Sequence, residues 1–291
     1  AFGGMPTYQL GAKYPYDFLT PIHKIFQLIP QPAEILFLYL LCTYLFLLII
    51  KIPIPIAIFG SFAYALSTYL LIILQVGHNT KAQAIAYMPV VIGGLYMILN
   101  NKRLLGFILT VFSLSMQIRA NHYQMTYYML ILMMIIFIFY GIKSFKDQSF
   151  KLFAKNSIVL IFSGLIALGF NAPPLLATSE YSKFSTRGET ELKFNSDGTT
   201  KESTGGLSKD YITQFSYGIF ESLNLIAPRI QGGGTTEDLG EDSDLYEFLV
   251  KNGASITQSK EFVANVPTYW GGQPILEAPA YIGASIFFLF I

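Results

Sequence analysis

A succession of long apolar runs, separated by short polar or Pro-containing segments, constrains the fold of this 291-residue chain more than any other feature. About 20 apolar residues are enough for a helix to cross the hydrocarbon core of a bilayer. Only 13% of the residues are charged, whereas a soluble domain carries about 25%. We therefore predict an all-α polytopic membrane protein, with the lipid bilayer as a partner. The predicted spans are Ile35–Ile50, Ile56–Val76, Ala84–Leu99, Leu104–Ile118, Met125–Ile142 and Asn156–Phe170, with a further span beginning near Tyr281.

These runs divide the chain into four predicted parts. Residues 1–33 form an extracytoplasmic juxtamembrane segment, in which Phe18–Leu28 is either a short interfacial helix or a plain surface loop. Residues 34–170 form a six-helix transmembrane region, residues 171–280 an extracytoplasmic loop region, and residues 281–291 the start of a further transmembrane helix. We expect the chain to be a fragment, because it starts without Met and stops inside an apolar run.

The charges of the short connections predict the orientation of the spans. One set of connections holds seven Lys and Arg residues, and the opposite set holds only Lys81 and Arg119. Cytoplasmic loops carry an excess of Lys and Arg, so the first set is predicted to face the cytoplasm. The opposite connections then face outside, together with the long segment that holds 15 of the 18 acids but 8 of the 19 bases. The seven basic residues are Lys51, Lys102, Arg103, Lys143, Lys146, Lys151 and Lys155.

Three short helices are predicted within the long outer segment. The spacing of Tyr and Phe predicts a helix over Asp210–Leu225. Ser243 is a suitable N-cap for a helix that runs to Asn252 and stops at Gly253. A third helix is predicted over Ser259–Val266.

Two polar clusters fall in short connections on the predicted outer face, and each contains a cation, a His and an Asn. Such side chains can bind a phosphate or a sugar through charge and hydrogen bonds. The alternative is that Lys and Arg only reach from the spans to the membrane surface. Because polar residues at this depth usually mark function, we predict a ligand site. The residues are His78, Asn79 and Lys81 in the first cluster, and Arg119, Asn121 and His122 in the second.

A third candidate region begins soon after the sixth span. Glu180 and Arg187 lie in the string EYSKFSTRGETEL together with two further Glu residues. Carboxylates suit hard cations, so this region could bind a divalent cation or a polar ligand. The alternative is a solvated charged face.

Six strings, in this order, carry a resemblance to a known family: FGGMPTYQ, GHNTKAQAIAYMP, IRANHYQMTYY, EYSKFSTRGETEL, KDYITQFSYG and PTYWGGQP. The chain resembles the YfhO family of large bacterial membrane proteins, which is similar to the GT-C class of glycosyltransferases. The resemblance implies a GT-C-like helix bundle with a large extracytoplasmic loop region in the bacterial cytoplasmic membrane. It also implies transfer of a sugar from a polyprenyl-phosphate donor to an envelope polymer acceptor on the extracytoplasmic face. No nucleic-acid partner is expected.

The resemblance implies roles for individual residues as well. Lys81 and Arg119 would hold the donor phosphate, and the catalytic carboxylate would lie upstream of Ala1. The residues lining the same pocket would be His78, Asn121 and His122.

Two other functions remain open from the sequence: a flippase or transporter for lipid-linked sugars, and a non-catalytic envelope scaffold. A transporter is expected to carry polar residues and broken helices near the middle of its spans. Here the middles of the predicted spans are almost entirely apolar, and the charges lie at their ends. This pattern favours the enzyme over the transporter.

Overall fold

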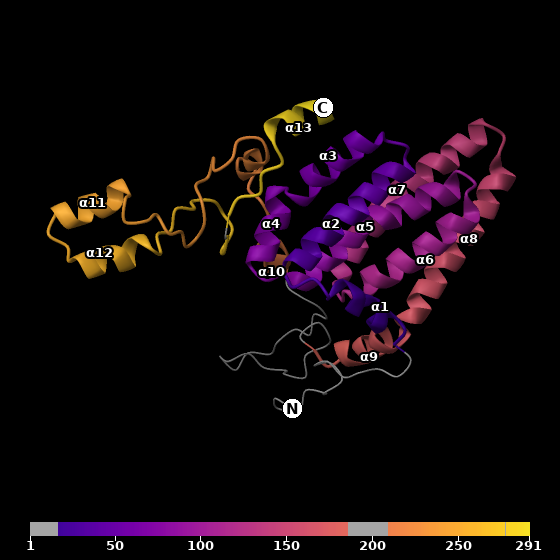
Figure 1. The fold of residues 1–291 in the computed structure, drawn as a ribbon, viewed down its shortest axis with the longest axis horizontal. Coiled ribbons are helices and arrows are strands. Elements are labelled where there is room, and N and C mark those ends of the chain that lie inside the picture. Colours follow the sequence, from indigo (N-terminus) through magenta and orange to yellow (C-terminus); the bar gives the residue numbers. More distant parts are fainter. Residues whose placement is uncertain (1–16, 186–208, 277) are drawn as a thin grey trace. The chain divides into compact units, whose positions relative to one another are not determined.

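The computed structural model describes residues 17–185, 209–276 and 278–291, and their regular secondary structure is entirely helical (Figure 1). The chain divides into two compact units. Unit 1 comprises residues 1–66 and 77–206, and unit 2 comprises residues 67–76 and 207–291. The predicted all-α class is therefore confirmed for the described residues.

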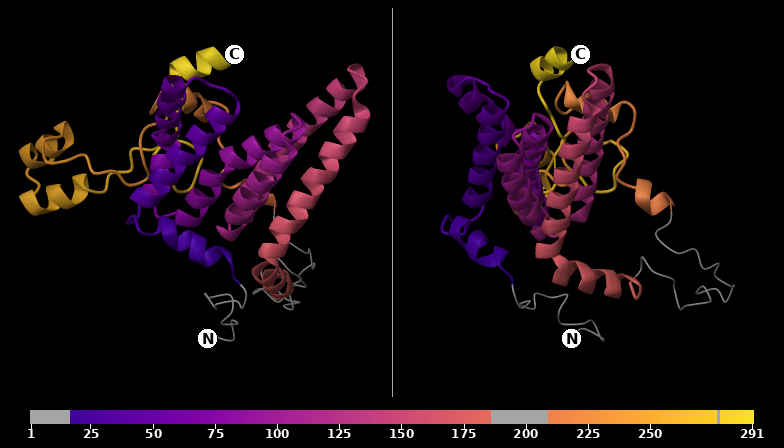
Figure 2. Two further views of the ribbon diagram at one scale, coloured as in Figure 1. Left: turned by 45° about the vertical axis from the view of Figure 1, so that its right-hand side comes forward. Right: turned by 90° about the vertical axis from the view of Figure 1, so that its right-hand side faces the viewer.

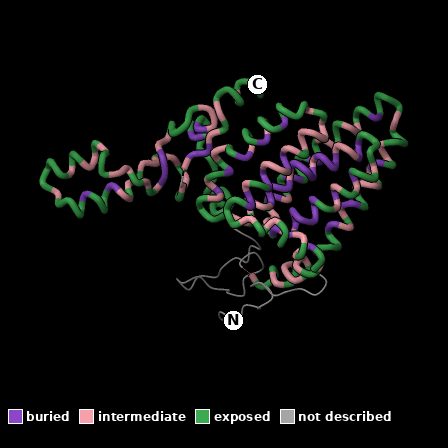
Figure 3. The backbone as a smooth tube through the Cα atoms, viewed as in Figure 1, coloured by how far each residue is buried: buried purple, intermediate pink, exposed green. Residues whose placement is uncertain are grey.

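Unit 1 is a helix bundle built around α5 (Asn79–Leu99). This helix packs against α2 (Ala33–Ile49) and α6 (Arg103–Arg119), and α6 packs in turn against α8 (Phe150–Phe170) (Figures 1 and 2). α7 (Tyr123–Lys146) contacts α5, α6 and α8. Because helices surround α5, 72% of its most apolar window is buried, against 17% for α7 and α8 (Figure 3).

Three shorter helices complete the described part of unit 1. α1 (Leu19–Phe26) packs against α6, so the predicted Phe18–Leu28 segment is a helix rather than a loop. α3 (Ile54–Ala65) packs against α2. α9 (Ala172–Ser182) directly follows α8.

Glycines allow α5 and α6 to approach each other closely. A Cβ atom on Gly106 would lie 2.8 Å from the backbone N of Ile98, and one on Gly94 would lie 3.0 Å from the backbone N of Thr110. Both distances are shorter than the 3.5–4.0 Å or so of an ordinary packed contact. Small residues at helix crossings have this role in membrane proteins. The two contacts also fix an antiparallel register that brings the start of α5 beside the end of α6.

Among the described residues, three helices are long and apolar enough to cross a membrane, namely α5, α7 and α8 with 21, 24 and 21 residues. A fourth candidate arises if α3 and the following α4 (Thr68–Gln75) count as one bent span. At 1.5 Å per residue, the 17 residues of α2 or of α6 extend only about 25 Å, which is less than the roughly 30 Å of a hydrocarbon core. The described residues thus hold three or four candidate spans where six were predicted.

The outer faces of the longest helices carry large apolar side chains. Leu130 on α7 is 50% exposed, and Ile158 on α8 is 67% exposed. In water such continuous faces would be costly, because each exposed apolar Å² costs about 25 cal/mol. These faces, together with the candidate spans, are those of an α-helical membrane protein.

The predicted second span, Ile56–Val76, is interrupted. α3 ends at Ala65, and Ser67 is extended, with ψ of 143°, before α4 begins. The Ser67 carbonyl then accepts the first hydrogen bonds of α4, from the N–H groups of Leu70 and Leu71. The break therefore restarts the helix within the apolar run, and α4 belongs to unit 2.

Three-residue turns connect α5, α6, α7 and α8 in sequence order. The turns are Asn100–Lys102, Ala120–His122 and Asp147–Ser149. Each contains one residue with left-handed backbone: Asn101 at φ 68°, Asn121 at φ 57° and Gln148 at φ 51°. A left-handed residue commonly ends a helix and redirects the chain.

Unit 2 contains short helices joined by irregular segments. α11 (Asp244–Lys251) packs against α12 (Ile256–Val263). The predicted cap is confirmed, because the Ser243 hydroxyl accepts a hydrogen bond from the Tyr246 N–H at 3.3 Å. α12 begins earlier than predicted, since Ser255 rather than Ser259 caps it.

The predicted helix over Asp210–Leu225 is wrong in its middle. The chain is helical at α10 (Lys209–Thr213) and at the 3₁₀ helix η3 (Glu221–Leu225), with irregular backbone between them. The Glu221 carboxylate accepts a hydrogen bond from the Gly218 N–H at 3.0 Å, which turns the chain before η3. A short apolar helix, α13 (Ala284–Phe290), lies where the last span was predicted to begin.

Candidate functional site

The candidate site lies at the Arg119 end of unit 1, defined here as α1, the first turns of α2, α5 and α7, and the last turns of α6 and α8. The antiparallel register of α5 and α6 places both predicted polar clusters at this end. Lys81 is in the first turn of α5, and Arg119 is the last residue of α6. The structure therefore brings together residues that are 38 positions or more apart in the sequence.

His122 joins the two predicted clusters. Burial lowers the pKa of the His122 imidazole, and the nearby Lys81 and His78 lower it further. Its Nδ1 atom is buried and has no hydrogen-bond partner among the described residues. A neutral, partly desolvated imidazole beside a lysine can accept a proton or a hydrogen bond from a ligand.

Arg119 connects the end of α6 to α1. Its Nη2 atom donates a hydrogen bond to the Thr20 hydroxyl at 2.9 Å. Its Nε atom is buried, and within the described parts of the chain it has no partner. One edge of the guanidinium thus holds α1, while another retains an unused donor.

Asp17 fixes the start of α1. Its carboxylate accepts hydrogen bonds from the N–H groups of Leu19 at 3.0 Å and Thr20 at 2.9 Å, and from the Thr20 hydroxyl. Partial burial acts to raise the pKa of this carboxyl, but these hydrogen bonds and the charge of Arg119 outweigh it and lower the pKa. Asp17, Thr20 and Arg119 therefore form one charge-assisted contact between α1 and the bundle.

Sequence reasoning missed a buried carboxyl group at this end. Glu34, in the first turn of α2, is 1% exposed, and neither carboxyl oxygen has a hydrogen-bond partner in the described structure. The Nδ1 atom of His23 lies 3.9 Å from its Oε1 atom, which is too long for a hydrogen bond. The signal in the sequence was an acid at the head of an apolar run, and burying it is costly unless it is paired.

His23 is the second residue of this end whose position the sequence did not indicate. Either an interfacial helix or a surface loop over Phe18–Leu28 would leave a His solvated, yet only 8% of His23 is exposed. Its Nε2 atom is 3.1 Å from the Nε2 atom of Gln27. Burial lowers the pKa of His23, the charge of Arg119 lowers it further, and Asp17 acts in the opposite direction.

An apolar groove of about 310 Å³ runs along α6 towards Arg119. Leu19 lines the groove and directly precedes Thr20, the residue that Arg119 contacts. Ser115 also lines the groove and lies one helical turn before Arg119. The remaining lining residues are Phe18, Ile22, Phe107, Ile108, Val111, Phe112 and Phe170. The groove is therefore apolar along its length and has a cation beside one end.

Of the remaining predicted site residues, one donates a hydrogen bond, two are exposed and one lies outside the described residues. Asn79 donates a hydrogen bond to the Gln31 side chain at 3.2 Å. Asn121 is exposed and supplies the left-handed turn between α6 and α7. Glu180 is exposed on α9, and no ion pair joins it to Arg119 in the described structure. Arg187 lies outside the described residues.

No group of three or more His, Cys, Asp or Glu side chains in the described ranges is arranged to hold a metal ion. Comparison of the chain with protein families, with curated proteins and with solved structures gives no match.

Proposed function

We propose that the chain is part of a GT-C-type membrane glycosyltransferase, as its resemblance to the YfhO family implies. The enzyme would move a sugar from a polyprenyl-phosphate donor to a cell-envelope acceptor on the extracytoplasmic face of the bacterial cytoplasmic membrane. The observation that carries the proposal is an apolar groove ending beside Arg119, with Lys81 and His122 at the same end of the bundle.

The two parts of a polyprenyl phosphate match these two features. An isoprenoid chain is apolar and suits a groove lined by Phe, Ile and Val side chains. A phosphate group is best held by a guanidinium, which can donate two parallel hydrogen bonds. The unused Nε donor of Arg119 could supply one of them.

The same cations would assist the reaction. When the sugar leaves the donor, negative charge develops on the phosphate oxygens. Positive groups fixed near those oxygens stabilise the transition state, and this effect is often the largest single contribution to catalysis. In this proposal Arg119 and Lys81 have that role.

Arg119→Lys tests the proposal, because Lys keeps the charge but cannot donate two parallel bonds. Losing a charge-assisted hydrogen bond costs about 1.5–3 kcal/mol, so we expect sugar transfer to fall roughly tenfold to a hundredfold when donor is limiting. Transfer would be measured with labelled polyprenyl-phosphate sugar in membranes that contain the whole protein.

Arg103→Lys is the matched control, because it makes the same substitution at the other end of the same helix, where a Lys can still donate one hydrogen bond to Asn156. Arg103→Lys should retain nearly full activity at equal expression. Equal losses in both variants would assign the effect to α6 itself and overturn the proposed role of Arg119. If detergent-solubilised protein transferred no sugar while sealed vesicles moved the donor across the bilayer, the flippase would replace the enzyme.

A further inference from the structure

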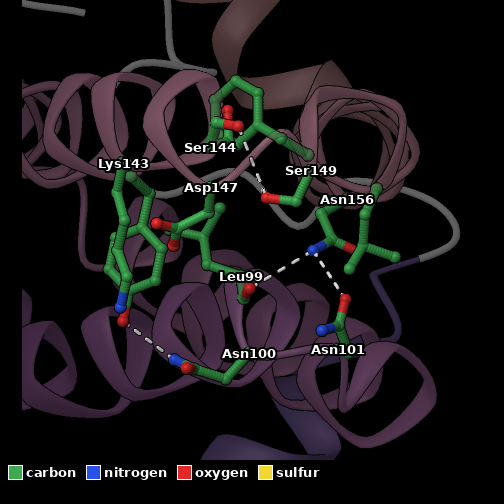
Figure 4. A pocket seen from close by; sticks show the side chains of 11 residues that line it. Leu99, Asn100, Asn101, Lys143, Ser144, Asp147, Ser149 and Asn156 are labelled. Atoms are coloured by element: carbon green, nitrogen blue, oxygen red, sulfur yellow. Dashed lines mark hydrogen bonds between the residues drawn. The ribbon is translucent and has the colours of Figure 1, made fainter.

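The opposite end of unit 1 contains a polar cavity that shares no residue with the Arg119 end. This Lys143 end comprises the turns Asn100–Lys102 and Asp147–Ser149 and the helix ends that they join. Between the two turns lies a cavity of about 170 Å³ (Figure 4). The lining includes the side chains of Lys143, Asp147 and Ser149.

A buried hydrogen-bond network fixes the walls of this cavity. Asn156 is 2% exposed, and its Nδ2 atom donates to the Leu99 carbonyl at 3.2 Å and to the Asn101 Oδ1 atom at 3.1 Å (Figure 4). Its Oδ1 atom accepts a hydrogen bond from the Nε atom of Arg103 at 2.7 Å. A satisfied buried network of this kind is rigid, so the cavity is preformed.

The charge of the Lys143 end favours an anionic ligand. Asp147 is the only acid between residues 99 and 156. Lys143 lines the cavity, and no ion pair joins it to Asp147 in the described structure. Further basic residues at this end are Lys102, Arg103, Lys146, Lys151 and Lys155.

An apolar groove adjoins the polar cavity. The groove has a volume of about 460 Å³ and lies between α2, α5 and α7. Tyr140 lines both the groove and the cavity, and its hydroxyl accepts a hydrogen bond from the Asn100 side chain at 2.9 Å. The other lining residues are Phe46, Ile50, Ile92, Tyr96, Ile135, Ile136 and Phe139.

We propose that the Lys143 end binds an anionic phospholipid with a hydroxylated head group, such as phosphatidylglycerol. The phosphate contacts Lys143 in the cavity, and one acyl chain lies in the groove beyond Tyr140. The head-group hydroxyls donate to Asp147, which would repel a bare phosphate. Basic pockets between membrane helices on the cytoplasmic side are typical binding places for anionic head groups.

This lipid site does not depend on the proposed sugar transfer. It uses none of the residues of the Arg119 end and lies at the other end of the same helices. Lipid binding and sugar transfer can therefore fail or succeed separately in experiments.

Thermal unfolding of the whole protein in a neutral detergent tests the inference. Added phosphatidylglycerol should raise the unfolding midpoint, because a ligand that binds only the folded state stabilises it. Phosphatidylcholine and phosphatidylethanolamine with the same chains should raise it much less. Lys143→Gln should weaken the apparent affinity for phosphatidylglycerol roughly tenfold, which is the loss expected for one charge-assisted hydrogen bond.

Lys151→Gln is the matched control, because it removes the same charge at the same end without lining the cavity. Its affinity should stay within about twofold of the wild-type value, since Lys151 does not line the cavity and a surface charge away from the ligand contributes little. If both substitutions weakened the affinity for phosphatidylglycerol equally, general surface charge would explain the binding, and the proposed lipid site would be wrong. Equal stabilisation by inorganic phosphate or by glycerol 3-phosphate would show an anion site without a lipid chain, and equal stabilisation by phosphatidylethanolamine would exclude selection for an anionic head group.

Discussion

Asn121 and His122 are neighbours in one three-residue turn, yet the structure gives them different roles. Asn121 is exposed, and its left-handed backbone is what the turn requires. His122 is half-buried, and its Nδ1 atom has no hydrogen-bond partner among the described residues. Burial lowers the pKa of its imidazole, and the charge of Lys81 lowers it further. The sequence shows only that polar residues gather here. It does not separate a side chain that shapes the backbone from one that can contact a ligand.

Glu34 illustrates the opposite failure at the same scale. An acid in the first turn of a helix is ordinarily favourable and solvated, because it faces the positive end of the helix dipole. The sequence therefore gave no reason to single it out. In the structure His23 of α1 lies 3.9 Å from its carboxylate, and α2 packs along α5. Only the packing of two separate helices reveals this carboxyl group.

The lowered pKa of His23 predicts an acid-sensitive contact between α1 and the bundle. Below pH about 6.5 the unfolded chain takes up a proton on this imidazole, whereas the folded chain resists it because of burial and the charge of Arg119, opposed by Asp17. The folded state is therefore most favoured above pH about 6.5 and loses stability as the pH falls through the lowered pKa of the folded state. Glu34 is the remaining titratable group beside the ring.

His23→Gln removes this titration and should make the unfolding midpoint less dependent on pH between 7.5 and 5, as measured by thermal unfolding in detergent. The slope should be reduced rather than abolished, because burial also lowers the pKa of His122. An unchanged slope in His23→Gln would contradict the assignment.

At the scale of elements, hydropathy located the helices but not their ends. The predicted span Ala84–Leu99 is the apolar part of α5, which begins five residues earlier at Asn79. Lys81 consequently lies on a helix and not in a loop. The apolar run marks only the stretch that suits a hydrocarbon core, whereas the helix also includes the polar residues of its first turn.

The break between α3 and α4 shows a different limit of the pattern. Leu66, Ser67 and Thr68 contain neither Pro nor Gly, so the usual signals that end a helix are missing. Ser67 is extended at the N-cap position of α4, which Ser favours, but a single Ser inside an apolar run does not predict a break by itself.

The close approach of α5 and α6 can be tested with a pair of glycines. Gly106→Ala would place a Cβ atom 2.8 Å from the backbone N of Ile98, and overpacking of this kind costs about 1–3 kcal/mol. Gly164 on α8 has no atom within 4 Å of an added Cβ. Gly164→Ala should therefore stabilise the helix by about 0.5–1 kcal/mol.

Thermal unfolding in detergent would measure both variants against the wild type. The midpoint should fall for Gly106→Ala and should hold or rise for Gly164→Ala. A Gly106→Ala protein as stable as the Gly164→Ala protein would mean that the two helices are farther apart than described.

At the scale of the whole molecule, the charge distribution predicts which end of unit 1 faces outside. The Lys143 end holds six of the seven residues predicted to be cytoplasmic, and the seventh, Lys51, follows α2. The separation of charge between the two ends could be predicted from the sequence, because it follows from the order of the apolar runs and the basic residues between them. The groove and the cavity could not be predicted from the sequence, because they depend on which helices are neighbours.

Thiol labelling in intact cells tests the orientation. The only cysteine, Cys42, is buried and can be replaced by Ala to give a background without thiols. In that background, Gln124→Cys at the Arg119 end should react with a membrane-impermeant reagent, and Lys151→Cys at the Lys143 end should react only after permeabilisation. Both positions are exposed, so access to the side chain itself is matched. The reverse pattern would place the proposed sugar transfer in the wrong compartment.

The three-residue turns have a consequence for any reconstituted preparation. A chain that reverses direction within three residues cannot let one of its long helices invert alone, so α5 to α8 must enter a vesicle as a block. Only two populations of vesicles can then exist, right-side-out and inside-out, with no partly inverted forms between them. Affinity capture through a tag at one end of unit 1 would therefore separate the two populations, and it would fix the side on which the Arg119 end and the Lys143 end each lie.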